Sequence, residues 1–237
     1  MSDIVFLITT YGRQASCQRL VDSLQGLGDI VVVGDGCGYN IARCRNINLP
    51  IHGGRIMYWG TVRVLFSHRG KHQYYFMLPD DCLPVPGMVE KAIDTWQKIK
   101  DPNKACLNLH TDRVGVACWT GILPKDKGFV YRTGWVDMCF LAEETFFRSI
   151  ELKPNCPKVG GSGVGAQISR QLVRKRLFMY QVKESLVIMQ DLPSQMHDKN
   201  NETKDYRRAC ERPDQKRIYD TRGQKPRRPG RRNHRRP

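Results

Sequence analysis

The stretch that decides the fold is YYFMLPDDC, residues 74–82, an apolar run that ends abruptly in two adjacent carboxylates. Five large apolar residues in succession predict a strand that is buried on both faces, as in a parallel sheet. The last residues of such strands point into the crevice at the carboxyl edge of an open α/β sheet, where ligands bind. Asp80 and Asp81 would repel each other there unless a cation lay between them.

Hard carboxylate oxygens suit Mg²⁺ or Mn²⁺, which proteins usually hold through one or two carboxylates together with substrate phosphates. The two acids therefore predict a metal site that holds a diphosphate. The alternative is a solvated turn after the strand, because Asp is also favoured in turns.

Strands and helices alternate around this stretch. Apolar runs at residues 3–9 and 30–33 predict two more buried strands, and segments at about 15–27, 55–68 and 87–99 predict helices. This alternation predicts an α/β fold with a mostly parallel sheet flanked by helices. The second half is less regular, with strands expected at residues 105–109, 114–119, 129–131 and 185–189, and helices in the latter part of 138–150 and at 166–177.

The composition fits a globular protein with a real core, since 40% of the 237 residues are hydrophobic. No apolar run approaches the roughly 20 residues that a membrane-spanning helix needs, and the amino end leads into a strand without a signal-type core. The nine cysteines are scattered and form no Cys-x-x-Cys pair, which counts against a zinc site or a disulfide framework. We therefore expect a cytoplasmic protein with reduced thiols.

The net charge of +16 is placed unevenly. Residues 199–237 contain 15 Lys and Arg against 5 Asp and Glu, a net charge of +10, which leaves +6 for residues 1–198. So polar a segment cannot bury enough apolar surface to offset its ordering entropy. We therefore expect one folded domain over residues 1–198 and a disordered basic tail over residues 199–237. Arginine-rich arms favour phosphate, in nucleic acid before anionic membrane, and the alternative is a solvated tail without a partner.

The common phosphate-binding motifs give little support for a phosphate site in this chain. The chain has no P-loop, and GDGCG at residues 34–38 fails the dinucleotide fingerprint because Tyr39 stands where the third glycine belongs. The glycine-rich loop at residues 160–165 precedes a basic helix and could cradle a phosphate, although such loops are more often simply flexible. Trp119, Phe129 and Trp135 offer rings for an acceptor to stack on, but core packing is the more common role.

Polar residues follow each of the first three strands, at what should be one edge of the sheet. Arg13 can pair with phosphate as a fork, and Tyr11 can stack on a base. Asp35 can accept a hydrogen bond from a base or a ribose hydroxyl. Their convergence with the acid pair predicts a nucleotide site at this edge.

In this order, TTYGR at residues 9–13, VGDG at residues 33–36 and FMLPDD at residues 76–81 resemble the motifs of nucleotide-sugar glycosyltransferases of the GT-A fold. The inverting family-two type and its small bacteriophage relatives are the most similar. The resemblance implies a GT-A (Rossmann-like) fold, a donor such as a UDP-sugar, and Mn²⁺ or Mg²⁺. It implies that Asp81 binds the metal and that His197, in SQMH at residues 194–197, completes its shell. The donor-binding residues that it implies are Thr9, Tyr11, Arg13, Asp35, Gly54, Arg55, Tyr58 and Asp80.

Inverting members of this family use a carboxylate to take the proton from the acceptor hydroxyl. Asp137, in GWVD at residues 134–137, is the first candidate for this base, and Glu143 and Glu144 are alternatives unless they form only the polar face of a helix. The acid pair departs from the family pattern, which has Asp-x-Asp or a third acid where this chain has Pro79 and Cys82.

The leading interpretation is a metal-dependent glycosyltransferase that moves a sugar to a hydroxyl on a hydroxymethylated pyrimidine in DNA, as in phage DNA hypermodification within a bacterial cytoplasm. The basic tail would supply affinity for the DNA. One alternative is an acceptor on a surface glycan or a lipid-linked sugar, against which the lack of apolar anchors in the tail counts. The others are a catalytically inactive nucleic-acid-binding module and a nucleotidyltransferase.

Overall fold

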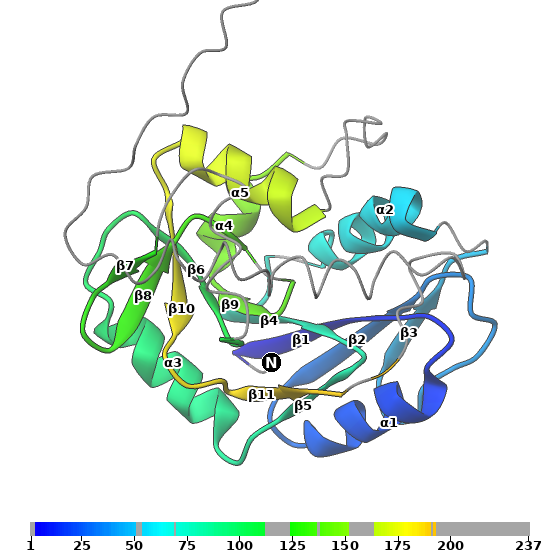
Figure 1. Ribbon diagram of the computed structural model, residues 1–237. Helices are drawn as coiled ribbons and strands as arrows, with labels where there is room; N and C mark the ends of the chain where they lie inside the picture. Colours follow the sequence, from blue (N-terminus) through cyan, green and yellow to red (C-terminus); the bar gives the residue numbers. More distant parts are fainter. Residues whose placement is uncertain are drawn as a thin grey trace, which may run out of the picture. The chain divides into compact units, whose positions relative to one another are not determined.

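The computed structural model describes residues 3–50, 54–68, 70–111, 124–136, 138–151, 164–190 and 192, with the backbone alone for residues 54–59. The elements along the chain, shown in Figure 1, are β1 (Ile4–Thr10), α1 (Gln14–Ser23), β2 (Asp29–Gly34), β3 (Arg45–Asn48), α2 (Gly54–Phe66), β4 (Tyr74–Pro79), β5 (Cys82–Pro84), α3 (Met88–Lys98), β6 (Lys104–Asn108), β7 (Lys125–Asp126), β8 (Val130–Thr133), β9 (Phe140–Ala142), α4 (Glu144–Arg148), α5 (Val164–Arg174), β10 (Phe178–Val182) and β11 (Val187–Met189).

The main sheet has the strand order β3-β2-β1-β4-β9-β6-β10-β8-β7. Strands β3, β2, β1 and β4 are parallel, and Thr9 of β1 pairs with Val33 on one side and Pro79 on the other. Strand β9 runs antiparallel between β4 and β6, and β10 is parallel to β6. The carboxyl ends of β1, β2, β4 and β6 therefore share one edge of the sheet, and β9 begins at that edge and ends at the opposite one.

Helices cover both faces of this sheet. Alternate side chains of β1 explain the division, because Phe6 and Ile8 pack with α1 and α3, whereas Val5 and Leu7 pack with α2, α4 and α5. In Figure 1 the first pair of helices lies below the sheet and the other three lie above it. Burial on both faces is what the continuous apolar runs predict, and each fully buried Leu, Ile or Phe contributes about 1.5–3 kcal/mol.

The predicted α/β sheet flanked by helices is confirmed, with local differences. Strand β3 was not predicted, because its sequence RNIN is polar and its residues are exposed or half-buried at the edge of the sheet. Strand β10 was not predicted either; the helix expected to reach residue 177 ends at Arg174, which leaves room for β10 to begin at Phe178. The strand expected at residues 114–119 lies outside the described residues. None of the helices within the described ranges combines the length and apolarity that crossing a membrane requires.

Helix α5 includes the last two residues of the glycine-rich loop, Val164 and Gly165. Ser169 donates a hydrogen bond to the carbonyl oxygen of Gly165 (2.6 Å) and accepts one from the backbone N–H of Val136 (2.8 Å). A Cβ atom on Gly165 would collide with the carbonyl oxygen of Val136. This glycine therefore serves close packing of α5 against the segment before residue 137, while residues 160–163 of the loop lie outside the described residues.

Two glycine substitutions are expected to change the free energy of unfolding in opposite directions, and the first of them tests this packing. Gly165→Ala is expected to lower the free energy of unfolding by about 1–3 kcal/mol, because the added methyl group overpacks the contact with Val136. Gly60→Ala in α2, where no described atom lies within 4 Å of the added Cβ, is expected to raise it by about 0.5–1 kcal/mol through helix propensity. Chemical denaturation measures both, and a stabilising Gly165→Ala would contradict the close approach.

Candidate functional site

The two acids after β4 converge on one arginine. Arg13 follows β1, and its Nη1 atom lies 3.1 Å from Oδ1 of Asp80 and 2.7 Å from Oδ2 of Asp81. The three side chains are only 12%, 8% and 15% exposed. A single guanidinium nitrogen thus bridges both carboxylates. The sequence predicts a cation between the two acids. In this structure that cation is the guanidinium of Arg13.

Asp80 is also held by the loop that follows β1. Thr10 Oγ1 donates to Asp80 Oδ2 (2.8 Å), and the backbone N–H of Tyr11 donates to the same oxygen (3.3 Å). Thr10 Oγ1 lies 3.0 Å from Tyr39 Oη, which in turn accepts from the backbone N–H of Arg13 (3.1 Å). Because Thr10 has one hydroxyl hydrogen and gives it to Asp80, Tyr39 is the donor to Thr10. A relay from Arg13 through Tyr39 and Thr10 therefore orients Asp80.

Burial shapes the electrostatics of this relay. It raises the pKa of the Asp80 carboxyl above its ordinary value, while the Arg13 guanidinium and the Thr10 hydroxyl act in the opposite direction. Burial also raises the pKa of Tyr39 to about 12, so its phenol stays protonated and can donate at neutral pH. An ionised Asp80 therefore depends on the cation and the donors around it.

The residue after β2 lies beside this group. Asp35 is 6% exposed, and its backbone N–H donates to the carbonyl oxygen of Thr10 (2.9 Å). Gly36 and Gly38 have positive φ angles of 69°, a conformation that glycine adopts without steric cost and that turns the chain back after the strand. The predicted convergence of the first three strand ends is thus observed, with Thr9 buried in β1 itself.

The end of the described chain returns to the acids. Strand β11 pairs with β5, which follows Asp81 directly. The backbone N–H of Gln190 donates to the carbonyl oxygen of Asp81 (2.7 Å), and its side-chain amide donates to Ser16 Oγ (2.8 Å). Ser16 Oγ donates in turn to the carbonyl oxygen of Asp80 (2.7 Å). The segment that leads toward residue 197 therefore leaves from the backbone of the acid pair.

The two glutamates considered as alternative bases lie elsewhere. Because β9 is antiparallel to β4, the residues after it are at the edge of the sheet opposite the acids. Glu143 accepts a hydrogen bond from Trp96 Nε1 (3.0 Å), and Glu144 accepts from Tyr75 Oη (3.0 Å) and from the backbone N–H of Gly70 (2.9 Å). Both carboxylates hold parts of the fold together.

Several predicted site residues escape a structural test. Gly54, Arg55 and Tyr58 lie in the first turns of α2, for which the structure describes the backbone alone, and Asp137, His197, Trp119 and residues 160–163 lie outside the described ranges. Among the described residues, no three His, Cys, Asp or Glu side chains form a metal-binding group. Asp80 and Asp81 nevertheless suit a divalent cation, because their oxygens already face one common cationic group.

Sequence reasoning missed four residues that position the acids, namely Thr10, Ser16, Tyr39 and Gln190. Thr10 stands between two residues that were singled out, so its neighbours were a usable signal. Tyr39 was noted only for interrupting the glycine pattern. The contact of Ser16 with Gln190 joins positions 174 residues apart, which no local pattern reveals.

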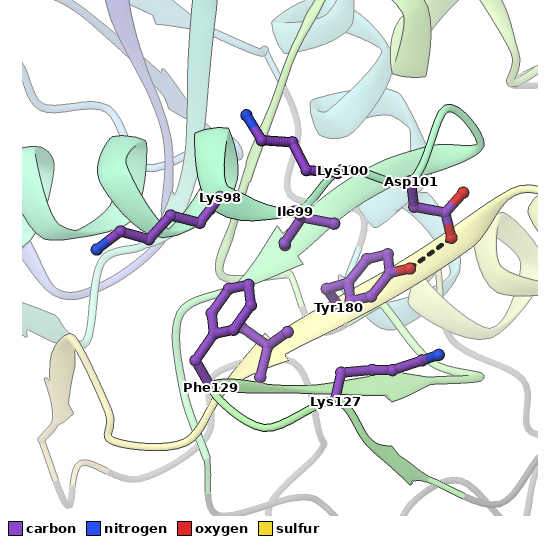
Figure 2. A pocket seen from close by; sticks show the side chains of 8 residues that line it. Lys98, Ile99, Lys100, Asp101, Lys127, Phe129 and Tyr180 are labelled. Atoms are coloured by element: carbon purple, nitrogen blue, oxygen red, sulfur yellow. Dashed lines mark hydrogen bonds between the residues drawn. The ribbon is translucent and has the colours of Figure 1, made fainter.

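A separate surface pocket lies near the end of α3 and has a volume of about 230 Å³. Figure 2 shows Phe129 and Tyr180 facing Ile99 there, with the labelled lysines extending outward and Tyr180 bonded to Asp101. Phe129 is 46% exposed, unlike a core ring. The segment between Lys98 and Asp101 leads into the amino end of β6. This pocket therefore lies at the edge of the sheet opposite Asp80 and Asp81.

Neither a protein-family model nor a curated protein matches the chain by sequence. Two solved structures match it by fold. One is GalNAc-T7 with UDP, GalNAc and Mn²⁺, with a TM-score of 0.55, 12% identity, and coverage of 76% of this chain and 42% of the other. The second is glucosyl-3-phosphoglycerate synthase from Mycobacterium tuberculosis with Mn²⁺ and UDP-glucose, with a TM-score of 0.54, 12% identity, and coverage of 80% and 72%. The chain thus spans less than half the length of the first, and it shares with both the GT-A fold that its motifs predict.

Proposed function

We propose that this protein is a metal-dependent glycosyltransferase that transfers a sugar from a nucleotide-sugar donor, and that this donor is a UDP-sugar. The observation that carries the proposal is the convergence of Asp80 and Asp81 on one cation at the carboxyl edge of a GT-A sheet. Ligands of open α/β sheets bind at this edge. The two solved structures that share the fold hold UDP or UDP-glucose together with Mn²⁺.

The metal would be Mn²⁺ or Mg²⁺, held by Asp81 with Asp80 beside it and with His197 as a further ligand. When bound, it neutralises the charge that develops on the leaving diphosphate. His197 is seven residues beyond Gln190, whose backbone is bonded to that of Asp81. Seven residues span at most about 25 Å, so His197 has ample chain to return to the acids.

The nucleotide would lie against the loops after β1 and β2, with Thr9, Tyr11 and Asp35 as its partners. Helix α2 begins at Gly54, after β3 ends at the same edge of the sheet as the acids. The amino end of a helix favours anions through its free N–H groups and its dipole. This supports the assignment of Gly54, Arg55 and Tyr58 to the diphosphate.

We assign the catalytic base to Asp137. Phe140 pairs with Met77, and β9 is antiparallel, so the chain before Phe140 runs toward the edge where β4 delivers Asp80. The preceding residues are anchored there, because Asn108 Nδ2 donates to the carbonyl oxygen of Trp135 (2.8 Å) and the backbone N–H of Val136 donates to Ser169. A carboxylate at this position would take the proton from the acceptor hydroxyl.

The direct test incubates the full chain with Mn²⁺ and a panel of nucleotide sugars and measures release of the nucleoside diphosphate. We expect slow donor hydrolysis with one UDP-sugar, lost on adding a chelator, and faster release once the acceptor is supplied. Failure of every donor to bind or to be hydrolysed, with or without metal, would overturn the proposal in favour of an inactive module.

The acceptor that we propose is a hydroxyl on a modified pyrimidine, such as a hydroxymethylated base, in DNA, as in phage DNA hypermodification. The net charge of +10 over residues 199–237 supports a polyanionic acceptor. Enzymes that modify bases need the base flipped out or single-stranded, and Trp119 or Trp135 would receive it. Mass spectrometry of nucleosides from DNA treated with the protein and donor tests this directly.

Removing residues 199–237 should weaken DNA binding and flatten its dependence on salt. Each phosphate that the tail contacts adds about 0.9 to the slope of log K against log salt, so the truncated chain should lose several units of slope. Fluorescence anisotropy with a labelled duplex at several salt concentrations measures this, and donor binding serves as the control that the remaining domain is intact. An unchanged slope would show that the tail does not engage the phosphates.

A further inference from the structure

We propose that Arg13 is a resident counter-ion of the acid pair, which a divalent metal must displace from Asp81 before the donor binds. The inference rests on the proposed function, and it concerns the order in which cations occupy one site. It predicts that the metal and the guanidinium compete for the same carboxylate.

The geometry makes them competitors. Nη1 of Arg13 is 2.7 Å from Asp81 Oδ2, the shorter of its two contacts, and the Asp81 side chain is only 15% exposed. A metal that binds this oxygen therefore competes with the guanidinium for the space beside it. Charge leads to the same conclusion, because two carboxylates are balanced by one divalent ion, whereas an added guanidinium at contact distance would repel it.

The backbone allows the exchange without unfolding. The N–H of Arg13 is bonded to Tyr39 Oη (3.1 Å), and its carbonyl oxygen accepts from the N–H of Cys17 at the start of α1 (3.0 Å). Asp80 keeps its bonds to Thr10 and Tyr11 when the arginine departs. Only the side chain has to rotate, and the released fork is then available for the diphosphate, the partner predicted for it from the sequence.

The first test compares Mn²⁺ affinity, by calorimetry or by electron paramagnetic resonance of free Mn²⁺, in the wild-type chain and in Arg13→Gln. We expect the variant to bind Mn²⁺ about tenfold more tightly or better, because its competitor is gone. Without metal the variant should melt at a lower temperature, since two buried acids are left unbalanced, and Mn²⁺ should raise its melting temperature more than that of the wild type. Arg170→Gln, at an exposed position on α5, makes the same change in net charge and should leave both quantities at wild-type values.

A second measurement needs no variant. Phenylglyoxal modifies accessible arginines, and peptide mass spectrometry gives the rate at each site. We expect Mn²⁺ to speed the labelling of Arg13 several-fold, while the exposed Arg174 on α5 provides an unchanged internal reference.

Equal or weaker Mn²⁺ affinity in Arg13→Gln, or a labelling rate of Arg13 that Mn²⁺ leaves unchanged or lowers, would overturn the exchange. Metal-dependent UDP binding that persists in that case would leave the proposed function intact. Conversely, exchange of Mn²⁺ for the arginine without any UDP binding would uphold this inference and overturn the function. If no Mn²⁺ binds to either chain, the exchange fails together with the metal site.

Discussion

Asp81→Asn is expected to abolish metal-dependent donor binding and to lower turnover by about 10³-fold or more, because the amide removes the charge that grips the metal at the leaving diphosphate. The change should be well tolerated by the fold. Asp80 keeps its contacts with Arg13, Thr10 and Tyr11, and Asp81 is not buried as deeply. The measurements are calorimetry with Mn²⁺ and a UDP-sugar, and release of UDP over time.

Asp94→Asn is the matched control for this experiment. Asp94 is 60% exposed and pairs with Lys98 on α3, so its amide should bind donor and turn over like the wild type. If Asp81→Asn retained metal-dependent binding, Asp81 would not be the metal ligand, and the function of the acid pair would be limited to its ion pair with Arg13.

Asp137→Asn is expected to separate binding from chemistry. Donor and Mn²⁺ affinities should stay within about twofold of wild type, while transfer to the acceptor falls by about 10²–10⁴-fold, the usual contribution of a positioned general base. Glu143→Gln is the control, because this residue lies at the opposite edge of the sheet and its amide oxygen can still accept from Trp96. If Asp137→Asn instead lost donor binding but kept a wild-type rate of transfer at saturating donor, the assigned roles would be reversed.

The parts of the fold that sequence reasoning recovered are those in which local pattern and tertiary position agree. Strands β1, β2 and β4 are continuous apolar runs because helices cover both of their faces, and their carboxyl ends carry the polar residues that mark the site. Strand β9 was missed because FLA lies within a longer apolar segment that also suits a helix. Its antiparallel direction, which places Glu143 at the edge opposite Asp80 and Asp81, depends on long-range pairing.

The same limit applies to the candidate site. The sequence indicates that Asp80 and Asp81 need a cation, because adjacent carboxylates repel wherever they are buried. It does not indicate that Arg13 supplies one, since that contact joins residues 68 positions apart. Tyr39 belongs to a relay that exists only once the loops after β1 and β2 meet, so a search for glycine motifs passes over it.

The bonds that orient the acids have a consequence for the order in which the native structure forms. Thr10 and Asp80 are 70 residues apart, and Ser16 and Gln190 are 174 apart. Contacts that close such long loops are slow to form, because the chain loses much entropy before any bond repays it. Competence to hold a ligand should thus be among the last properties to emerge during folding. A chain cut before Gln190 would lack the bonds from Gln190 to Ser16 and to the backbone of Asp81. Ligand binding would therefore report on completion of the native state.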